Sequence, residues 1–193
     1  MKKYNIIYAD PPWEYTDVEG FKMFHGGVKR HYNMMGTNEI CKIPVRDFAD
    51  EDCLLFIWAT FPNLLEVFKV IEAWGFEYKS VAFTWIKLNA KNKRPFFGIG
   101  YYTKSNAEVC LIATKGKPSK LKISNKVSSV IMSERREHSR KPDEARTRIV
   151  QLCGDKPRIE LFARQKFKGW DVWGNEAPTE EQTTITERNA ILT

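Results

Sequence analysis

Apolar and polar positions along the chain fall into blocks whose periods predict strands and helices in turn. Short runs that are apolar throughout, or apolar at every second position, predict strands at residues 4–9, 53–58, 76–87, 107–114 and 158–163. Two longer stretches place their apolar residues on one helical face and predict helices at residues 63–74 and 142–153. Strands interleaved with helices predict an α/β fold, with a mostly parallel sheet covered by helices on both faces and ligands beyond the carboxyl ends of the strands.

The segment directly after the first predicted strand carries the most chemical information, because it reads Asp10-Pro11-Pro12-Trp13. The exocyclic amine of adenine is a poor nucleophile, since its lone pair is delocalised into the ring. An ionised Asp10 only accepts hydrogen bonds and Pro11 offers a carbonyl without an N–H, so together they can take both amine protons. Pro12 restricts the backbone further, and Trp13 offers a face on which a base can stack. We therefore predict that these four residues form the catalytic slot for a planar amine.

The same residues are also compatible with a strand that ends in a Pro-Pro turn, in which Trp13 covers the core. Further motifs follow in a fixed order: Cys53-Leu54-Leu55-Phe56-Ile57-Trp58-Ala59-Thr60, Trp74-Gly75-Phe76, Trp85-Ile86-Lys87, Gly98-Ile99-Gly100-Tyr101-Tyr102, Glu108-Val109-Cys110-Leu111, Lys115-Gly116-Lys117-Pro118, His138-Ser139-Arg140-Lys141-Pro142-Asp143-Glu144, Ile159-Glu160-Leu161-Phe162-Ala163-Arg164 and Trp173-Gly174-Asn175-Glu176. With these motifs, residues 4–176 resemble the family of the catalytic subunit of the eukaryotic mRNA adenosine methylase, the DPPW or MT-A-seventy methyltransferases, in its short bacterial or phage form.

This resemblance implies an S-adenosylmethionine-dependent, Rossmann-like methyltransferase fold over residues 1–176, followed by a polar tail at 177–193. In the family the order is permuted, so that the amine-binding motif comes first and the donor-binding strand last. The resemblance implies N6-methyladenine as the product. It also assigns the donor S-adenosylmethionine to a set of cofactor-binding residues: Asp10, Lys141, Phe162, Arg164, Asn175 and Glu176. Without the family, Lys141 would be a solvated residue beside a helix start, and Asn175 and Glu176 a turn after a glycine.

Substrate contacts are expected from two further regions. Residues 14–36 show no convincing period and are expected to form a gate over donor and base, with Tyr32 near the base, or else a surface loop. Lys87 matches a family lysine at the acceptor site. Between residues 88 and 106, Lys93, Arg94 and Tyr101 belong to a basic stretch interleaved with aromatic residues, which is typical of nucleic-acid contact but also of a solvated face.

Charge and composition limit the class of protein. The chain has 193 residues, 42% hydrophobic and 28% charged, and a net charge of +7, which suits one domain with a nucleic-acid partner. Five lysines between residues 115 and 126 form a second basic stretch. No apolar run is long enough to span a membrane, so we expect a cytoplasmic protein without a membrane partner. The four cysteines form no C-x-x-C pair and the three histidines lack ligand spacing, so we expect buried free thiols and no metal site.

The resulting hypothesis is a DNA adenine-N6 methyltransferase of site-specific or low specificity. The same reaction on RNA is the alternative, because no identifiable residue reads the 2′-hydroxyl. A non-catalytic nucleic-acid-binding subunit is the hypothesis from another class, and the intact Asp10 argues against it. We expect a homodimer, with a monomer as the alternative.

Overall fold

A computed structural model describes residues 2–14, 34–100, 102–136 and 140–174. The strands in this part of the chain are β1 (Tyr4–Ala9), β2 (Ala49–Ala59), β3 (Glu77–Leu88), β4 (Ala107–Lys115), β5 (Val130–Glu134), β6 (Arg158–Leu161) and β7 (Asp171–Trp173). The helices there are α1 (Thr37–Cys41), α2 (Val45–Phe48), α3 (Leu64–Ala73) and α4 (Glu144–Cys153), with short 3-10 turns at Phe61–Asn63 and Pro118–Leu121.

The strands form one mixed sheet in the order β5-β3-β4-β2-β1-β6-β7. Strand β1 pairs in parallel with both β2 and β6, and the pairs β6–β7 and β3–β5 are also parallel. Strand β4 runs antiparallel to β2 and to β3. The predicted α/β class is confirmed. The sheet is mixed rather than purely parallel, because β4 runs antiparallel to both of its neighbours. The sequence did not indicate this direction, since an apolar run reports the burial of a strand and not its direction.

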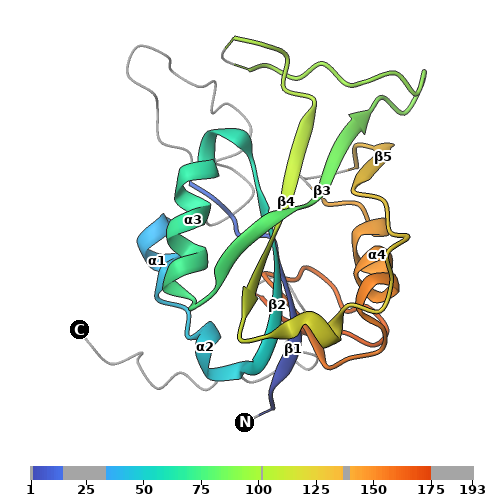
Figure 1. Ribbon diagram of the computed structural model, residues 1–193. Helices are drawn as coiled ribbons and strands as arrows, with labels where there is room; N and C mark the ends of the chain where they lie inside the picture. Colours follow the sequence, from blue (N-terminus) through green and yellow to red (C-terminus); the bar gives the residue numbers. More distant parts are fainter. Residues whose placement is uncertain (1, 15–33, 101, 137–139, 175–193) are drawn as a thin grey trace.

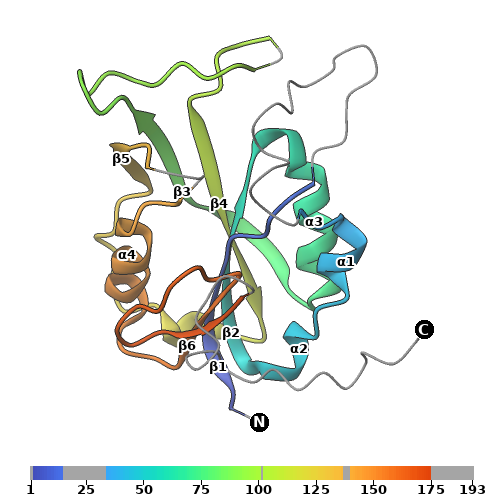
Figure 2. The ribbon, with the colours of Figure 1, turned by 180° about the vertical axis from the view of Figure 1, so that it is seen from behind.

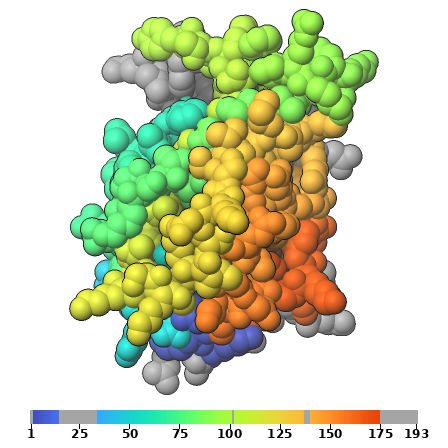
Figure 3. All heavy atoms as spheres, turned by 45° about the vertical axis from the view of Figure 1, so that its right-hand side comes forward, coloured from blue at the N-terminus to red at the C-terminus, as the bar shows by residue number. Residues whose placement is uncertain are grey.

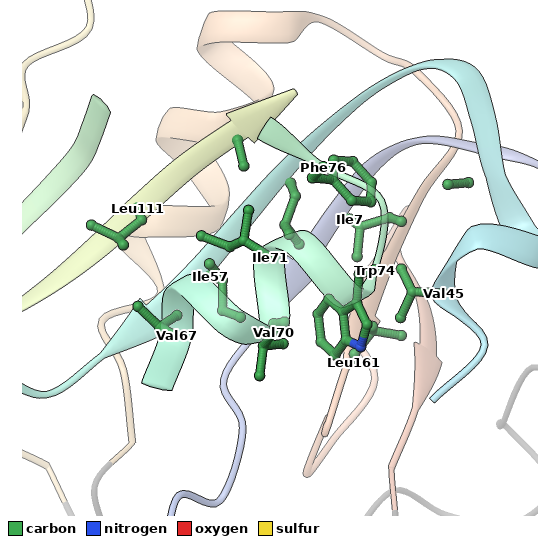
Figure 4. Close-up of a cluster of buried hydrophobic side chains, with 14 of the residues drawn as sticks. Ile7, Val45, Ile57, Val67, Val70, Ile71, Trp74, Phe76, Leu111 and Leu161 are labelled. Carbon is green, nitrogen blue, oxygen red and sulfur yellow. The ribbon is translucent and has the colours of Figure 1, made fainter. Parts of the chain in front are cut away.

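Helices cover both faces of this sheet, so the molecule has three layers (Figures 1 and 2). Helices α1, α2 and α3 lie on one face, where Ile7 and Leu55 belong to the apolar cluster that they cover; Figure 4 shows this cluster around α3. Helix α4 lies on the other face, where Ile6 and Phe56 belong to the second cluster. Successive residues of β1 and β2 thus enter opposite cores, which explains why these strands are apolar throughout.

The five predicted strands and two predicted helices are present, with shifted ends. Strand β2 begins at Ala49, four residues before the predicted start, and β6 ends at Leu161 rather than at residue 163. Phe162 ends β6 because its φ of 60° is not a strand conformation. Helices α1 and α2 and strands β5 and β7 were not predicted from the sequence, since elements of three to five residues are too short for a hydrophobic period to identify them.

Candidate active site

The proposed slot lies at the edge of the sheet where the parallel strands end, which faces upward in Figure 1. Ala9, the last residue of β1, pairs with Leu161, the last residue of β6, so Asp10 and Phe162 leave the sheet side by side. Because β4 runs the opposite way, its first residues reach the same edge: Val109 pairs with Ala59 at the end of β2. Chain direction thereby brings Glu108 to the site that Asp10 opens.

Asp10 is held by Lys141. The Lys141 Nζ lies 2.7 Å from Asp10 Oδ1, and the side chains are 9% and 22% exposed respectively. Burial raises the pKa of Asp10 above its ordinary value, and the positive charge of Lys141 opposes that rise. The carboxylate is therefore partly desolvated but charge-paired, so it can accept a hydrogen bond from a neutral amine without losing its own charge.

The Pro11 and Pro12 carbonyls are tied into the local backbone. Pro11 O accepts a hydrogen bond from the main-chain N–H of Trp13 at 2.9 Å, and Pro12 O accepts one from Met35 at 2.9 Å. A carbonyl oxygen has two lone pairs, so Pro11 keeps one for a further donor. These hydrogen bonds fix the direction of the Pro11 carbonyl, which the sequence analysis predicts to accept a hydrogen bond from the amine.

Trp13 lies mostly in the core. Its side chain is 6% exposed, belongs to the cluster under α1 and α3, and donates from Nε1 to the main-chain oxygen of Trp58 at 3.0 Å. Trp58 in turn donates from Nε1 to the Tyr8 hydroxyl at 2.7 Å. The stacking face predicted for Trp13 is therefore largely covered, because the indole N–H donates to a main-chain oxygen of β2 and the ring packs in the core next to Asp10-Pro11-Pro12.

Glu108 is a site residue that the sequence reasoning missed. It is 6% exposed, forms an ion pair with Lys87 on β3, and places Oε2 3.3 Å from Lys141 Nζ. Burial favours the neutral acid, but Lys141 and Lys87 outweigh it and lower the pKa of Glu108; the two carboxylates likewise outweigh burial and raise the pKa of Lys141. An acid inside the apolar run 107–114 was the signal that could have revealed it.

A second buried ion pair lies behind the site. Arg146 on α4 donates from Nε to Glu160 Oε2 on β6 at 2.6 Å, and a second bond joins its Nη2 to the other carboxylate oxygen. The guanidinium also lies over the rings of Tyr8 and Phe167, 5.3 and 3.8 Å from the centroids. Burial raises the pKa of Glu160, and Arg146 opposes it. This pair joins α4 to the strand on which the donor residues are expected.

The donor side is described only in part. Phe162 packs edge-on against Trp173 with ring centroids 5.7 Å apart, and Ala163 N donates to Trp173 O at 3.0 Å. A Cβ on Gly174 would lie 2.5 Å from Ala163 N, so only glycine allows the end of β7 to approach this closely. Arg164 acts on Asp10 as a nearby positive charge. Asn175 and Glu176 lie outside the described residues.

The predicted substrate residues are spread over two places. Lys87 takes part in the ion-pair network, whereas Lys93 and Arg94 lie exposed in the connection between β3 and β4, where Lys93 pairs with Glu134. Tyr101 lies outside the described residues, as do Tyr32 and most of the expected gate at 14–36. The described residues of this connection, 89–100 and 102–106, extend from the body at the top of Figure 1 and are called the arm below.

The second basic stretch lies at the other end of the sheet. Lys115 pairs with Cys53 near the start of β2, and the chain from there to residue 126 continues along that edge, as the yellow surface at the lower left of Figure 3 shows. Because β4 runs antiparallel to β2, residues 115–126 follow the end of β4 that lies farthest from Asp10.

Within the described ranges no group of three or more His, Cys, Asp or Glu side chains is arranged to hold a metal ion. All four cysteines are free, and Cys53, Cys110 and Cys153 are buried. No helix in the part of the chain that the structure describes is long and apolar enough to cross a bilayer.

The sequence of the chain is similar to those of known proteins. The profile of the MT-A70 family matches residues 4–176. The chain is 36% identical over 191 residues to the type II methyltransferase M.MunI of a Mycoplasma species, an alignment that covers 92% of the chain and 79% of that protein. It is 31% identical over 180 residues to a putative N(6)-adenosine-methyltransferase MT-A70-like protein of Medicago truncatula, and 27% identical over 179 residues to the N(6)-adenosine-methyltransferase catalytic subunit METTL3 of Homo sapiens. The chain spans 27% and 28% of these two longer proteins.

Proposed function

Because the chain belongs to the MT-A70 family, we propose that it is an S-adenosylmethionine-dependent methyltransferase that modifies the N6 amine of adenine in DNA. The observation that carries the proposal is the Asp10 carboxylate at the carboxyl edge of β1, partly desolvated, ion-paired with Lys141 and followed by the fixed carbonyl of Pro11. These are the two acceptors that a primary aromatic amine needs for its two N–H groups.

Asp10 and Pro11 would act on the amine by accepting its protons. Hydrogen bonds to both N–H groups favour a more tetrahedral nitrogen, whose lone pair is then directed out of the ring plane. In that geometry Asp10 and Pro11 would present the nitrogen lone pair to the methyl group that a bound sulfonium donor would supply, with the sulfur left as a neutral thioether, and the nitrogen would release one proton to water. The rigid Pro-Pro backbone contributes chiefly by holding the amine in line.

The donor-side residues fit S-adenosylmethionine in their chemistry. When bound, this cofactor supplies a methyl group on a positively charged sulfur. Its amino-acid end carries one carboxylate and one ammonium, for which Lys141 and Asp10 offer opposite charges at the same place. Phe162 and Arg164 follow β6 at the same edge, and Asn175 with Glu176 are proposed for the ribose hydroxyls.

We further propose that the fold is the permuted form of the methyltransferase sheet. In chain order the amine-binding strand β1 comes first and the proposed donor strand β6 near the end, yet the two are direct neighbours in the sheet. This chain order supports the permutation, and the adjacency lets the residues proposed for acceptor and donor meet at one edge of the sheet.

DNA is the favoured substrate, because the chain aligns with 79% of a type II methyltransferase but with only 27% and 28% of two longer N(6)-adenosine-methyltransferases. The arm is the proposed nucleic-acid contact. It carries four cations and no acid, and Phe97 and Tyr102 are 67% and 102% exposed, so it can meet both phosphates and bases. A homodimer remains the proposed assembly, to be checked by light scattering.

The substrate class can be tested by radiolabelled methyl transfer to oligonucleotides of one sequence, made as single- and double-stranded DNA and as RNA. The proposal expects label in DNA, recovered as N6-methyladenine after digestion. Label in RNA alone would replace DNA by the alternative substrate, and label on cytosine would exclude the adenine slot.

A further inference from the structure

Four side chains of alternating charge lie in a row at the candidate active site. The row runs from Asp10 to Lys141, then to Glu108, and ends at Lys87. Its members come from four separate places: the end of β1, the segment before α4, the start of β4 and the end of β3. The two carboxylates and two ammonium groups sum to zero charge.

Burial makes this balance consequential. The side chains of Glu108, Lys141 and Lys87 are 7%, 9% and 15% exposed, so water compensates little for a missing partner. A buried charge that loses its partner is costly, whereas a pair removed together leaves no unpaired charge. Removing the charge of one member should therefore destabilise the protein through the neighbour that is left unpaired. For Glu108 and Lys87, the effect of removing one charge should depend on whether the other charge is still present.

We propose that Glu108 and Lys87 are positioning residues, which hold Lys141 in place against one oxygen of Asp10 and keep the net charge of the four-residue row at zero. This inference rests on the proposed function. Lys141 is fixed because a carboxylate lies on each side of it, at 2.7 and 3.3 Å. Asp10 is then held by one oxygen while the same carboxylate receives the amine.

Loss of the Glu108 charge would leave two ammonium groups facing one carboxylate. The added positive charge opposes the step in which the amine nitrogen itself becomes cationic, so it should slow methyl transfer. Loss of the Lys87 charge would leave two carboxylates facing one ammonium group, so Glu108 would draw Lys141 away from Asp10. Loss of both leaves the neutral pair of Asp10 and Lys141.

A double-mutant cycle tests this balance with Glu108→Gln, Lys87→Met and the double variant. We expect each single variant to lose about tenfold or more in kcat, and the double variant to recover most of that loss. The melting temperature of the protein without donor should follow the same pattern, because only the single variants bury an unpaired charge. Glu66→Gln and Lys69→Met, which split an exposed ion pair on α3, form a matched control cycle with no effect on kcat.

If a single variant fails to fold, the double variant decides the case, since it carries no unpaired charge: a double variant that folds and turns over faster than the remaining single variant supports the proposal, and one that does not fold overturns it. The proposal would be overturned by a double variant whose loss in kcat equals the product of the two single losses and whose loss in melting temperature equals their sum. If the wild-type protein methylates adenine but the effects of the two substitutions are additive, this inference alone is overturned. A wild type that methylates no nucleic acid would overturn the proposed function as well.

Discussion

Replacing Lys141 with Met should destabilise the protein in a way that depends on pH. Lys141 is 9% exposed and pairs with Asp10 and Glu108. Methionine keeps an unbranched apolar stem of similar length but removes the ammonium group. Glu108 keeps its pair with Lys87, so the charge left without its partner is mainly that of Asp10.

The magnitude follows from the cost of removing one member of a buried ion pair, about 3–5 kcal/mol. At about 2–4 °C per kcal/mol for a chain of this length, the melting temperature should fall by about 6–20 °C near neutral pH. The lower half of this range is expected, because Asp10 retains 22% exposure and can take up a proton.

The sign of the pH dependence follows from Asp10. Burial raises the pKa of Asp10 and Lys141 opposes the rise, so the pKa should climb further in Lys141→Met. A carboxyl group whose folded pKa lies above its unfolded value binds its proton more readily in the folded state. Stability of the variant therefore falls as the pH rises through that pKa and is regained as the pH falls.

Thermal unfolding followed by circular dichroism, at several values between about pH 5 and pH 8, measures this effect. The difference in melting temperature between wild type and variant should be largest at the highest pH and should become smaller as the pH is lowered. Lys69→Met, which removes an exposed partner of Glu66, should stay within about 2 °C of wild type throughout. A gap below about 3 °C at every pH, or one that does not narrow, would refute the assignment of Lys141 as the counter-charge of Asp10.

Three other changes test other parts of the site. Trp13→Phe keeps a ring but removes the indole N–H that donates into β2, and should cost about 1 kcal/mol in urea unfolding; an unchanged midpoint would contradict a supporting role. Gly174→Ala forces the end of β7 away from the chain that follows β6, and should weaken donor binding in calorimetry; unchanged affinity would separate that contact from the donor site. Arg94→Ala in the arm should lower the salt dependence of DNA binding by about one phosphate contact, and an unaltered slope would exclude Arg94 from the interface. For wild type, the acid limb of kcat/KM should lie above the ordinary range of an aspartate, since burial raises the pKa of Asp10; a limb within that range would contradict its role.

Long apolar patterns in the sequence predicted the part of the fold that positions the site. The central strands β1 and β2 are buried on both faces, so their apolar runs are continuous and easily recognised. The direction of β4 was not predictable in this way, because a buried strand has the same pattern in either direction. That direction matters here, since it brings Glu108 to the site and carries residues 115–126 away from it.

The individual site residues divide along a similar line. Asp10 and Lys141, assigned from two motifs far apart in the sequence, lie in contact because β1 and the segment before α4 meet at one edge. Glu108 was missed because a lone acid in a strand normally marks a solvent-facing position, and only its two lysine partners make its burial tolerable. Trp13 was assigned to the surface of the slot, but its N–H had a buried acceptor that no sequence pattern reports.

The central claim is that the Asp10 carboxylate holds the adenine amine, and Asp10→Asn tests it most directly. The variant keeps the shape of the side chain, so its melting temperature and its donor affinity are measured first. We then expect kcat for N6-methyladenine formation in DNA to fall by about a hundredfold or more, while Asp155→Asn, at a carboxylate that is 93% exposed, keeps wild-type turnover. Asp10→Asn turning over within about threefold of wild type, which is under 1 kcal/mol of transition-state stabilisation, would contradict the account.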